Sequence, residues 1–376
     1  MRVIVVGAGI GGLAIAVGLR QAGVDVQLLE RADRVRAHGS GLSLFGNGFR
    51  ALDALGIGDQ VRAAAGPAVV VHRSGTRRPD GSWLTRMAST HDVRVIDRAD
   101  LYRILLAAVP AGSIRTGARV VEVGDTSVVL DTGERRSADV IVGADGLRSA
   151  VRTNAFDDPG VRDCGYGAWR AVTTGSVALD DAGETVGLGA RFGIAPLADG
   201  RVYWFACVST PPGSNPAGDA GMEEVRRGFG HWHPPIEEIL DATDPASVSY
   251  LPIEELAAPL ASFVSGRRVL IGDAAHAMTP NLGQGANLAI EDAATLATLL
   301  VAAKHGDELP AVLARYDALR RRRTQRIARQ AKALGVVMQA SHPVTATLRD
   351  LAMRSVPARV VDSRLRAVTS WSPPTP

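Results

Sequence analysis

The chain has 376 residues, which exceeds the usual size of one hydrophobic core and predicts two interlocked domains. Its composition, 46% hydrophobic and 22% charged, is that of a folded globular protein and excludes a disordered or fibrous chain. The net charge of +3 excludes the strong basic field of a nucleic-acid-binding protein.

The cysteines and the N-terminus indicate where in the cell the protein is expected. Cys164 and Cys207 are too few for a disulfide framework in a chain of this length, so we interpret both as buried thiols in a reducing cytoplasm. The N-terminus enters a strand at once and carries no signal-peptide pattern. No run of about 18 apolar residues predicts a helix that spans a membrane. We therefore expect a cytoplasmic protein without an integral membrane segment.

The chain opens with a predicted strand, helix and second strand. Residues 2–6 are largely apolar and end at Gly7, a pattern typical of a parallel strand buried on both faces. The helix that follows ends near Gly23, and residues 24–30 form the second strand. A further helix is predicted at residues 98–108.

Short β-rich runs dominate the middle of the chain, and helices dominate its end. The predicted strands span residues 119–123, 127–130, 138–142, 168–174, 191–196, 201–208, 247–251 and 268–271. The predicted helices span residues 222–240, 284–303 and 309–337, followed by a C-terminal helical segment. Prolines and glycines at 211–218 predict a surface loop. We interpret the arginines at 320–323 as the solvated face of a long helix.

The sequence GAGIGG at residues 7–12 follows the first strand and opens the first helix. Gly7 permits a tight turn, Gly9 lets the backbone approach a pyrophosphate, and Gly12 allows close packing of helix on strand. Glu30, at the end of the second strand, is placed to accept hydrogen bonds from an adenosine ribose, and its charge disfavours a 2′-phosphate there. The motif therefore predicts a dinucleotide site for FAD or NAD.

A second strand, turn and helix occurs at residues 272–287, GDAAHAMTPNLGQGAN. Asp273 is placed to accept hydrogen bonds from a ribityl chain, and the N–H groups of Gly283 to Ala286 lie at a helix N-terminus. Such donors can stabilise the negative charge of a reduced flavin ring, so this motif favours FAD. We interpret His276 as a structural hydrogen-bonding residue rather than a catalytic base. No group has metal-ligand spacing, so no metal is expected.

These two motifs, together with GADG at residues 143–146, resemble the class A flavoprotein monooxygenases, the aromatic hydroxylases typified by para-hydroxybenzoate hydroxylase. The resemblance spans nearly the whole chain and includes RADL at 98–101 and GRVYWF at 200–205. Within the family the chain is similar to short members such as urate hydroxylase and salicylate-type hydroxylases.

The resemblance implies an α/β fold in which a Rossmann-like FAD domain is interleaved with a mixed β-sheet substrate domain and followed by C-terminal helices. The FAD domain is expected in three segments, 1–68, 98–162 and 258–335. The substrate domain is expected at 69–97 and 163–257, and the C-terminal helical segment at 336–376.

The resemblance also implies a reaction. NADH or NADPH would reduce FAD, O2 would form a flavin C4a-hydroperoxide, and an aromatic or polycyclic small molecule would attack its distal oxygen in a site that excludes water. The protein is expected to be a monomer or homodimer. No catalytic residue is assigned, but Pro280 and the turn from Gly283 to Gly285 are expected beside the flavin ring. The residues expected to bind the cofactors are Gly7, Gly9, Gly12, Glu30, Arg31, Ser43, Arg98, Val120, Asp145, Gly146, Asp273, Pro280, Gly283, Gln284, Gly285, Ala286 and Asn287.

The chain departs from the family in one loop. Many members carry an aromatic residue and a proline before the asparagine of the flavin-contacting loop, whereas this chain has Phe45, Gly46, Asn47 and Gly48. The extra glycine freedom predicts a more mobile loop.

Three residues are candidates for substrate contact. Arg191 stands before an apolar strand, in the position of a substrate-contacting arginine of the urate hydroxylases; the alternative is that it pairs with an acid at the domain interface. Tyr203 and Trp204 are expected to line a planar aromatic site, although tryptophan is more often part of a core.

Two other functions remain open from these residues. A non-hydroxylating flavin oxidoreductase, such as a dehydrogenase, reductase or halogenase, would use the same cofactor domain, although the WxWxIP signature of halogenases is absent. An FAD-binding regulatory protein without turnover would retain the same motifs. Among hydroxylases, catabolic, biosynthetic and antibiotic-inactivating roles are all compatible with the sequence.

Overall fold

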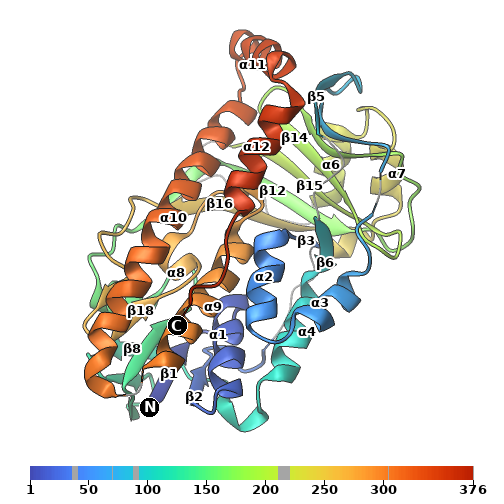
Figure 1. Ribbon diagram of the computed structural model, residues 1–376. Coiled ribbons are helices and arrows are strands. Elements are labelled where there is room, and N and C mark those ends of the chain that lie inside the picture. Colours follow the sequence, from blue (N-terminus) through green and yellow to red (C-terminus); the bar gives the residue numbers. More distant parts are fainter. Residues whose placement is uncertain (36–40, 70, 88–92, 211–220, 304, 376) are drawn as a thin grey trace.

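The computed structural model describes residues 1–35, 41–69, 71–87, 93–210, 221–303 and 305–375 (Figure 1). The loop expected at 211–218 lies outside these residues.

A six-stranded sheet in the order β17–β18–β11–β1–β2–β7 forms the base of the first unit. Only β17 runs antiparallel to its neighbour among these strands. The residues of β1 after the first, and all of β11, are buried, as expected for strands covered on both faces. The strands are β1 (Arg2–Val6), β2 (Asp25–Leu29), β7 (Ile114–Arg115), β11 (Val140–Gly143), β17 (Val264–Ser265) and β18 (Arg268–Leu270).

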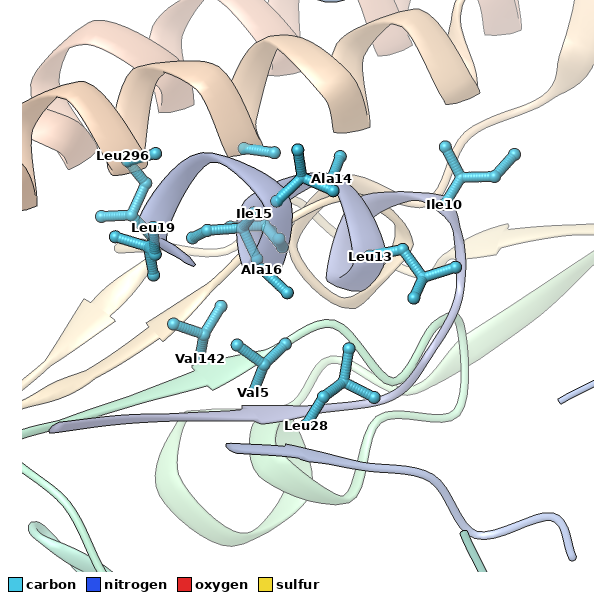
Figure 2. Packing of buried hydrophobic residues seen from close by; sticks show 14 of the residues in the cluster. Val5, Ile10, Leu13, Ala14, Ile15, Ala16, Leu19, Leu28, Val142 and Leu296 are labelled. Atoms are coloured by element: carbon cyan, nitrogen blue, oxygen red, sulfur yellow. The ribbon is translucent and has the colours of Figure 1, made fainter. Parts of the chain in front are cut away.

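Helix α1 (Ile10–Gln21) lies between this sheet and helix α9 (Gly285–Ala302), and it is apolar on both sides (Figure 2). Val5, Leu28 and Val142 of the sheet point toward α1. On its other side, a Cβ on Gly18 would lie 3.0 Å from the Cβ of Ala297, so glycine allows α1 and α9 to approach closely. Burial of each large apolar side chain in this core contributes about 1.5–3 kcal/mol.

A seven-stranded sheet in the order β16–β12–β15–β14–β13–β4–β5 forms the second unit. Helices α6 (Gly221–Phe229) and α7 (Ile236–Asp241) cover one of its faces through a core rich in aromatic residues. The single helix predicted at 222–240 is wrong, because Pro234 and Pro235 lack the N–H groups that a continuous helix needs. The strands are β4 (Arg73–Arg77), β5 (Trp83–Met87), β12 (Val161–Val172), β13 (Asp181–Val186), β14 (Ala190–Pro196), β15 (Val202–Ser209) and β16 (Ser249–Leu256).

Two small sheets and several helices complete the units. Strand β3 (Gly41–Leu44) pairs with β6 (Arg94–Asp97), and the order β10–β9–β8 includes the hairpin predicted at 119–130. The strands of the second small sheet are β8 (Val120–Val123), β9 (Ser127–Leu130) and β10 (Arg135–Ser137). The remaining helices of the cofactor unit are α2 (Gly46–Ala54), α3 (Gly58–Ala65), α4 (Arg98–Ala108), α5 (Ala150–Ala155) and α8 (Asp273–His276).

The chain ends in three helices, α10 (Leu309–Met338), α11 (Pro343–Ser355) and α12 (Ala358–Thr369). Figure 1 shows α10 running along the length of the molecule, with α11 at one end of it. Arg320 and Arg323 of α10 point inward and pair with Glu291 of α9 at 2.7 and 2.8 Å. The interpretation of the arginine run as a solvated face is therefore wrong for these two residues.

Helix α9 is long and apolar enough, by length and composition alone, to cross a membrane, which the sequence prediction missed. In the structure 72% of it is buried inside the protein. Its two charged residues, Glu291 and Asp292, are fully buried and paired with arginines of α10. These features are those of the core helix of a globular unit.

Candidate active site

Four predicted cofactor-binding segments meet at one edge of the parallel sheet. GAGIGG follows β1, Glu30 follows β2, Asp145 follows β11 and Asp273 follows β18, and these strands are adjacent and parallel. Because the carboxyl ends of neighbouring parallel strands lie at the same edge, the four segments gather in one place.

The three glycines after β1 meet different steric requirements. Gly7 has φ +101°, and a Cβ there would lie 2.5 Å from the carbonyl oxygen of Ala144. A Cβ on Gly12 would lie 1.9 Å from the carbonyl oxygen of Gly7, whereas a Cβ on Gly9 would meet nothing within 4 Å. Helix α1 has no side-chain cap and no acidic residue in its first turn, so its N–H groups remain available to a phosphate.

Glu30 holds the turn after β1. Its carboxylate accepts hydrogen bonds from the N–H groups of Ala8 at 2.8 Å and Ala32 at 2.9 Å. Each oxygen keeps a second lone pair for a ribose hydroxyl. From α4, the Tyr102 hydroxyl donates to the Ala8 carbonyl at 2.6 Å, and burial, with help from Glu30, raises the pKa of Tyr102 to about 12.

Asp145 is held beside the same edge by the start of α5. It accepts hydrogen bonds from the Ser149 hydroxyl at 2.5 Å and the Val151 N–H at 3.1 Å. Burial raises the pKa of Asp145, and these hydrogen bonds oppose that rise. Gly146 has φ +79°, and a Cβ there would find open space.

The turn before α9 presents free backbone donors. Gly283 has φ +63°, and both it and Pro280 are exposed. The cap residue Gln284 makes no side-chain cap, and the first turn of α9 holds no acid, so its first N–H groups are free. Asp273 is also exposed, and no described residue donates to its carboxylate. The first part of α9 lies next to α1, since a Cβ on Gly11 would be 3.5 Å from the Cβ of Ala289.

The loop that departs from the family is anchored to this turn. Asn47 is fully buried and donates to Gln284 Oε1 at 3.0 Å, while Asn287 Oδ1 accepts from the Phe45 N–H at 3.1 Å. A Cβ on Gly48 would lie 2.2 Å from Asn287 Oδ1. Gly48 therefore serves close packing at the start of α2, and residues 46–48 begin this helix instead of forming a loop. The greater mobility expected of this segment stays a prediction.

His276 lies behind the turn in a buried charge network. Its Nε2 is 2.6 Å from Asp292 Oδ2, and Asp292 also accepts from the Gly272 N–H and from Arg320 Nε. Burial alone would raise the pKa of Asp292, but His276 and Arg320 together lower it. His276 is 4% exposed, which fits the structural interpretation of this residue rather than a catalytic base.

The second sheet turns the face not covered by α6 and α7 toward these cofactor turns. The Tyr166 hydroxyl accepts a hydrogen bond from Asn281 Nδ2 at 3.1 Å, directly after Pro280. Tyr203 packs against β3, where a Cβ on Gly41 would lie 2.2 Å from the tyrosine ring. We call this surface the substrate face.

Trp204 does not lie on the substrate face. Side chains alternate along a strand, so Tyr203 and Trp204 point to opposite faces. Trp204 is fully buried beneath α6 and α7, stacks on Phe192 with ring centres 5.5 Å apart, and donates to Thr243 Oγ1 at 2.9 Å. The prediction that Trp204 lines the substrate site is wrong, because the residue belongs to the core.

Arg191 lies on the substrate face, but its guanidinium already has partners within the protein. Its Nη1 is 3.2 Å from Glu184 Oε1, its Nε donates to Gln339 Oε1 at 2.8 Å, and its guanidinium is 5.4 Å from the centre of the Tyr166 ring. Burial raises the pKa of Glu184 against the pull of Arg191. The pairing with an acid that the sequence left as an alternative is therefore present, although within the sheet.

The remaining predicted cofactor residues lie on several different elements. Arg98 begins α4, and Arg31 is exposed after β2. The Ser43 carbonyl accepts from Asn287 Nδ2 at 3.0 Å. Val120 is 6% exposed at the start of β8, so its side chain is not available to a ligand. The roles of these residues stay predictions.

Known proteins match this architecture closely. The family described as FAD binding domain matches residues 1–331. The chain belongs to the class A flavoprotein monooxygenases. This monooxygenase is 36% identical to the aurachin C monooxygenase/isomerase of Stigmatella aurantiaca over 99% of both chains. It is 35% identical to the 3-amino-4-hydroxybenzoate 2-monooxygenase of Streptomyces cremeus, covering 94% of this chain and 92% of the relative.

A solved structure supports the fold of the monooxygenase. Klebsiella pneumoniae HpxO in complex with FAD and uric acid matches it with a TM-score of 0.87 and 27% identity, covering 98% of this chain and 96% of that one. FAD is therefore the cofactor of the family to which the chain belongs. The open space at Gly9, the uncapped starts of α1 and α9 and the free Asp273 carboxylate suit its phosphates, ring and ribityl chain.

Sequence reasoning missed several residues of the monooxygenase's substrate face. The Phe205 ring lies flat on β14, where a Cβ on Gly193 would be 2.1 Å away, and its centre is 6.3 Å from that of Tyr203. Arg170 lies beside Tyr203, and burial, with Arg98 nearby, lowers the pKa of Arg170. The alternation of side chains along β15 is the signal that would have selected Tyr203 and Phe205 together.

Proposed function

We propose that this monooxygenase uses NADH or NADPH and O2 to hydroxylate a planar aromatic substrate held against the substrate face. The carrying observation is that Tyr203 and Phe205 present two adjacent rings on the same sheet face that contacts the turn before α9 through Tyr166 and Asn281. When bound there, FAD supplies the oxygen-activating chemistry.

The protein's own groups have distinct parts in this proposal. The free N–H groups of Gly285 and Ala286 at the start of α9 would face the ring of FAD and supply fixed donors for negative charge on it. Asp273 orients the ribityl chain. The rings of Tyr203 and Phe205 bind the planar substrate and exclude water from the reacting atoms.

The charges on the substrate face bear on the substrate's chemistry. Arg191 is already neutralised by Glu184, so that end of the face suits an uncharged polar edge of a ring rather than a carboxylate. The relatives act on or bind planar compounds, 3-amino-4-hydroxybenzoate and uric acid. We expect the enzyme to act as a monomer or homodimer in the cytoplasm, which suits its two free cysteines.

The test is the oxidation of NADH and of NADPH by the FAD-loaded enzyme in air, with a panel of phenols, purines and polycyclic aromatics and with isotope-labelled O2. A compound that accelerates oxidation and gains one labelled oxygen atom supports the proposal. The proposal fails if NADH and NADPH both reduce the bound FAD but no panel compound accepts oxygen from O2, or if neither nucleotide reduces it.

A matched pair of variants tests the substrate face. Phe205→Ala removes a ring from this face, so the KM for an accepted substrate rises about tenfold while FAD affinity is unchanged. Trp204→Phe alters the opposite face, so it lowers the melting temperature and leaves KM unchanged. An equal KM effect of both variants would show that the sheet face does not bind the substrate.

A further inference from the structure

Half of the exposed large hydrophobic residues in the described part of the chain gather at one end of the molecule. Twelve such side chains are exposed, and six of them lie at this end. We call this set the apolar tip; its members are Leu188, Val336, Val337, Val344, Leu348 and Leu351, which are 57%, 71%, 47%, 60%, 60% and 64% exposed.

Backbone hydrogen bonds bring the three segments of the apolar tip together. The hairpin between β13 and β14 carries Leu188, and the Gly189 N–H donates to the Ala340 carbonyl after α10 at 2.9 Å. Arg349 of α11 donates to the Gly187 carbonyl at 3.0 Å. Figure 1 shows α11 at the extremity of the molecule, beyond the end of α10. The tip is therefore a fixed surface.

Helix α11 has two unlike faces. Its inner face buries Ala346 and the ion pair between Arg349 and Asp350. Its outer face carries Val344, Leu348 and Leu351 at the spacing i, i+4, i+7, which forms one stripe along a helix. No described element covers this stripe, and an exposed contiguous apolar patch marks a site of interaction.

The charge of the surrounding segment identifies the partner. Residues 309–376 contain 13 lysines and arginines and three acidic residues. Arg320, Arg323 and Arg349 are paired inside the protein, whereas nine of the basic residues and none of the acidic ones are exposed. Arg354 and Arg359 flank the end of α11 and are exposed, and Arg326 and Arg329 are exposed farther along α10. An apolar stripe bordered by exposed arginines complements a surface that is both apolar and anionic.

We propose that the apolar tip docks the enzyme on an anionic lipid membrane surface, with α11 lying in the interfacial plane. Leu348 and Leu351 enter the boundary of the acyl chains, and the arginines contact lipid phosphates. A second copy of the chain is a poorer occupant, because two tips would bring two strongly basic segments together.

Docking through the apolar tip would bring one end of the substrate face close to the membrane. Gln339, which follows α10 at the base of the tip, donates to the Gly189 carbonyl and accepts from Arg191 on the substrate face. The tip thus places one end of that face near the lipid. This consequence rests on the proposed function, whereas the docking itself does not.

The experiment is vesicle flotation of the full FAD-loaded chain. Vesicles of phosphatidylcholine mixed with phosphatidylglycerol retain the protein, vesicles of phosphatidylcholine alone do not, and added salt weakens the retention. The double variant Leu348→Ser and Leu351→Ser binds the mixed vesicles about tenfold or more weakly, because both apolar contacts are lost. Leu319→Ser is the matched control, since Leu319 is 44% exposed on α10 away from the tip.

Three results would overturn the proposal. They are a failure of the unmodified chain to bind mixed vesicles, equal binding by the double variant, and light scattering that shows a dimer which the double variant converts to a monomer. The loss of a dimer in the double variant would show that the apolar tip is an interface between two copies of the chain. Each variant is first shown to retain FAD, so a loss of vesicle binding reports on the tip and not on folding. None of these readouts depends on turnover.

Discussion

Two glycines of the first motif are expected to respond differently to alanine. A Cβ on Gly12 would lie 1.9 Å from the Gly7 carbonyl oxygen, which is backbone and cannot swing aside. Gly12→Ala is therefore expected to lower the free energy of unfolding of the apoprotein by about 1–3 kcal/mol. Gly9→Ala meets nothing within 4 Å, so it leaves the apoprotein's stability within about 0.5 kcal/mol but weakens FAD binding.

The measurements are urea unfolding of both apoproteins and titration with FAD followed by flavin fluorescence. If Gly9→Ala binds FAD as tightly as the unmodified protein, the pyrophosphate does not approach at Gly9. The steric argument at Gly12 needs no ligand and is tested by the unfolding curve alone.

The roles of single residues were predictable where the local backbone conformation alone determines which residue fits. The glycines of GAGIGG follow from the turn and the helix start, and the structure places them as the motif requires. The prediction for Trp204 was wrong because it considered only that the side chain is aromatic. Tyr203 and Trp204 are neighbours on one strand, so their side chains point to opposite faces of the sheet. Arg191 was left open because its partner Glu184 lies on another strand whose register the sequence does not specify.

At the scale of elements, α9 and α10 are joined by buried charges that make a pH prediction possible. Burial alone would raise the pKa of Asp292, but His276 and Arg320 lower it below its ordinary value. A lowered pKa adds stability that is present above the unfolded pKa of about 3.9 and is lost as the pH falls through the folded value. Asp292→Asn is expected to cost about 3–5 kcal/mol at neutral pH, because Arg320 loses one of its two buried carboxylate partners and His276 loses its charged partner.

The gap in unfolding free energy between Asp292→Asn and the unmodified protein is expected to narrow as the pH falls below about 4, where Asp292 of the unfolded chain becomes protonated, and to close only below the lowered pKa of the folded protein. Denaturant unfolding at a series of pH values measures it. The control is Asp53→Asn, which removes a surface pair with Arg62 and is expected to cost less than about 1 kcal/mol. A gap that stays constant across the acid range would contradict the assigned role of Asp292.

Helices and strands were predicted best where residues close together in the sequence determine them. Helix α4 was predicted with the bounds that the structure shows, because Asp100 lies in its first turn and its apolar positions repeat at helical spacing. The break between α6 and α7 was missed although Pro234 and Pro235 mark it. The inward direction of Arg320 was not accessible, because its partners Glu291 and Asp292 lie on a different helix.

At the scale of the whole molecule, the domain arrangement was predicted from the family resemblance and not from local patterns in the sequence. Residue patterns indicated a β-rich middle and a helical end of the chain, and strands followed by glycine turns indicated where a cofactor binds. They did not indicate that the residues after α12 also contact the cofactor unit. These contacts join residues about 320 positions apart in the chain, which no periodicity records.

The last described residues form a strap across the cofactor unit, and its removal gives a prediction for the whole fold. Arg50 of α2 donates to the carbonyls of Thr369 and Trp371 at 2.6 and 2.5 Å, and Arg323 of α10 donates to that of Ser370 at 3.2 Å. Because α2 also carries Asn47, which anchors the turn before α9, loosening the strap is expected to reach the flavin site.

A chain ending at Thr369 is therefore expected to unfold with a free energy lower by about 1–3 kcal/mol, because charged donors lose their acceptors. Its affinity for FAD should fall a few-fold, in step with the loosening of α2. Urea unfolding and FAD titration measure the two effects. Arg315→Gln is the control, because Arg315 contacts only the carbonyl of Thr375 and leaves α2 in place. If the shortened chain matched the unmodified protein in both measurements, the strap would not hold α2, and the position of Asn47 would be set by α9 alone.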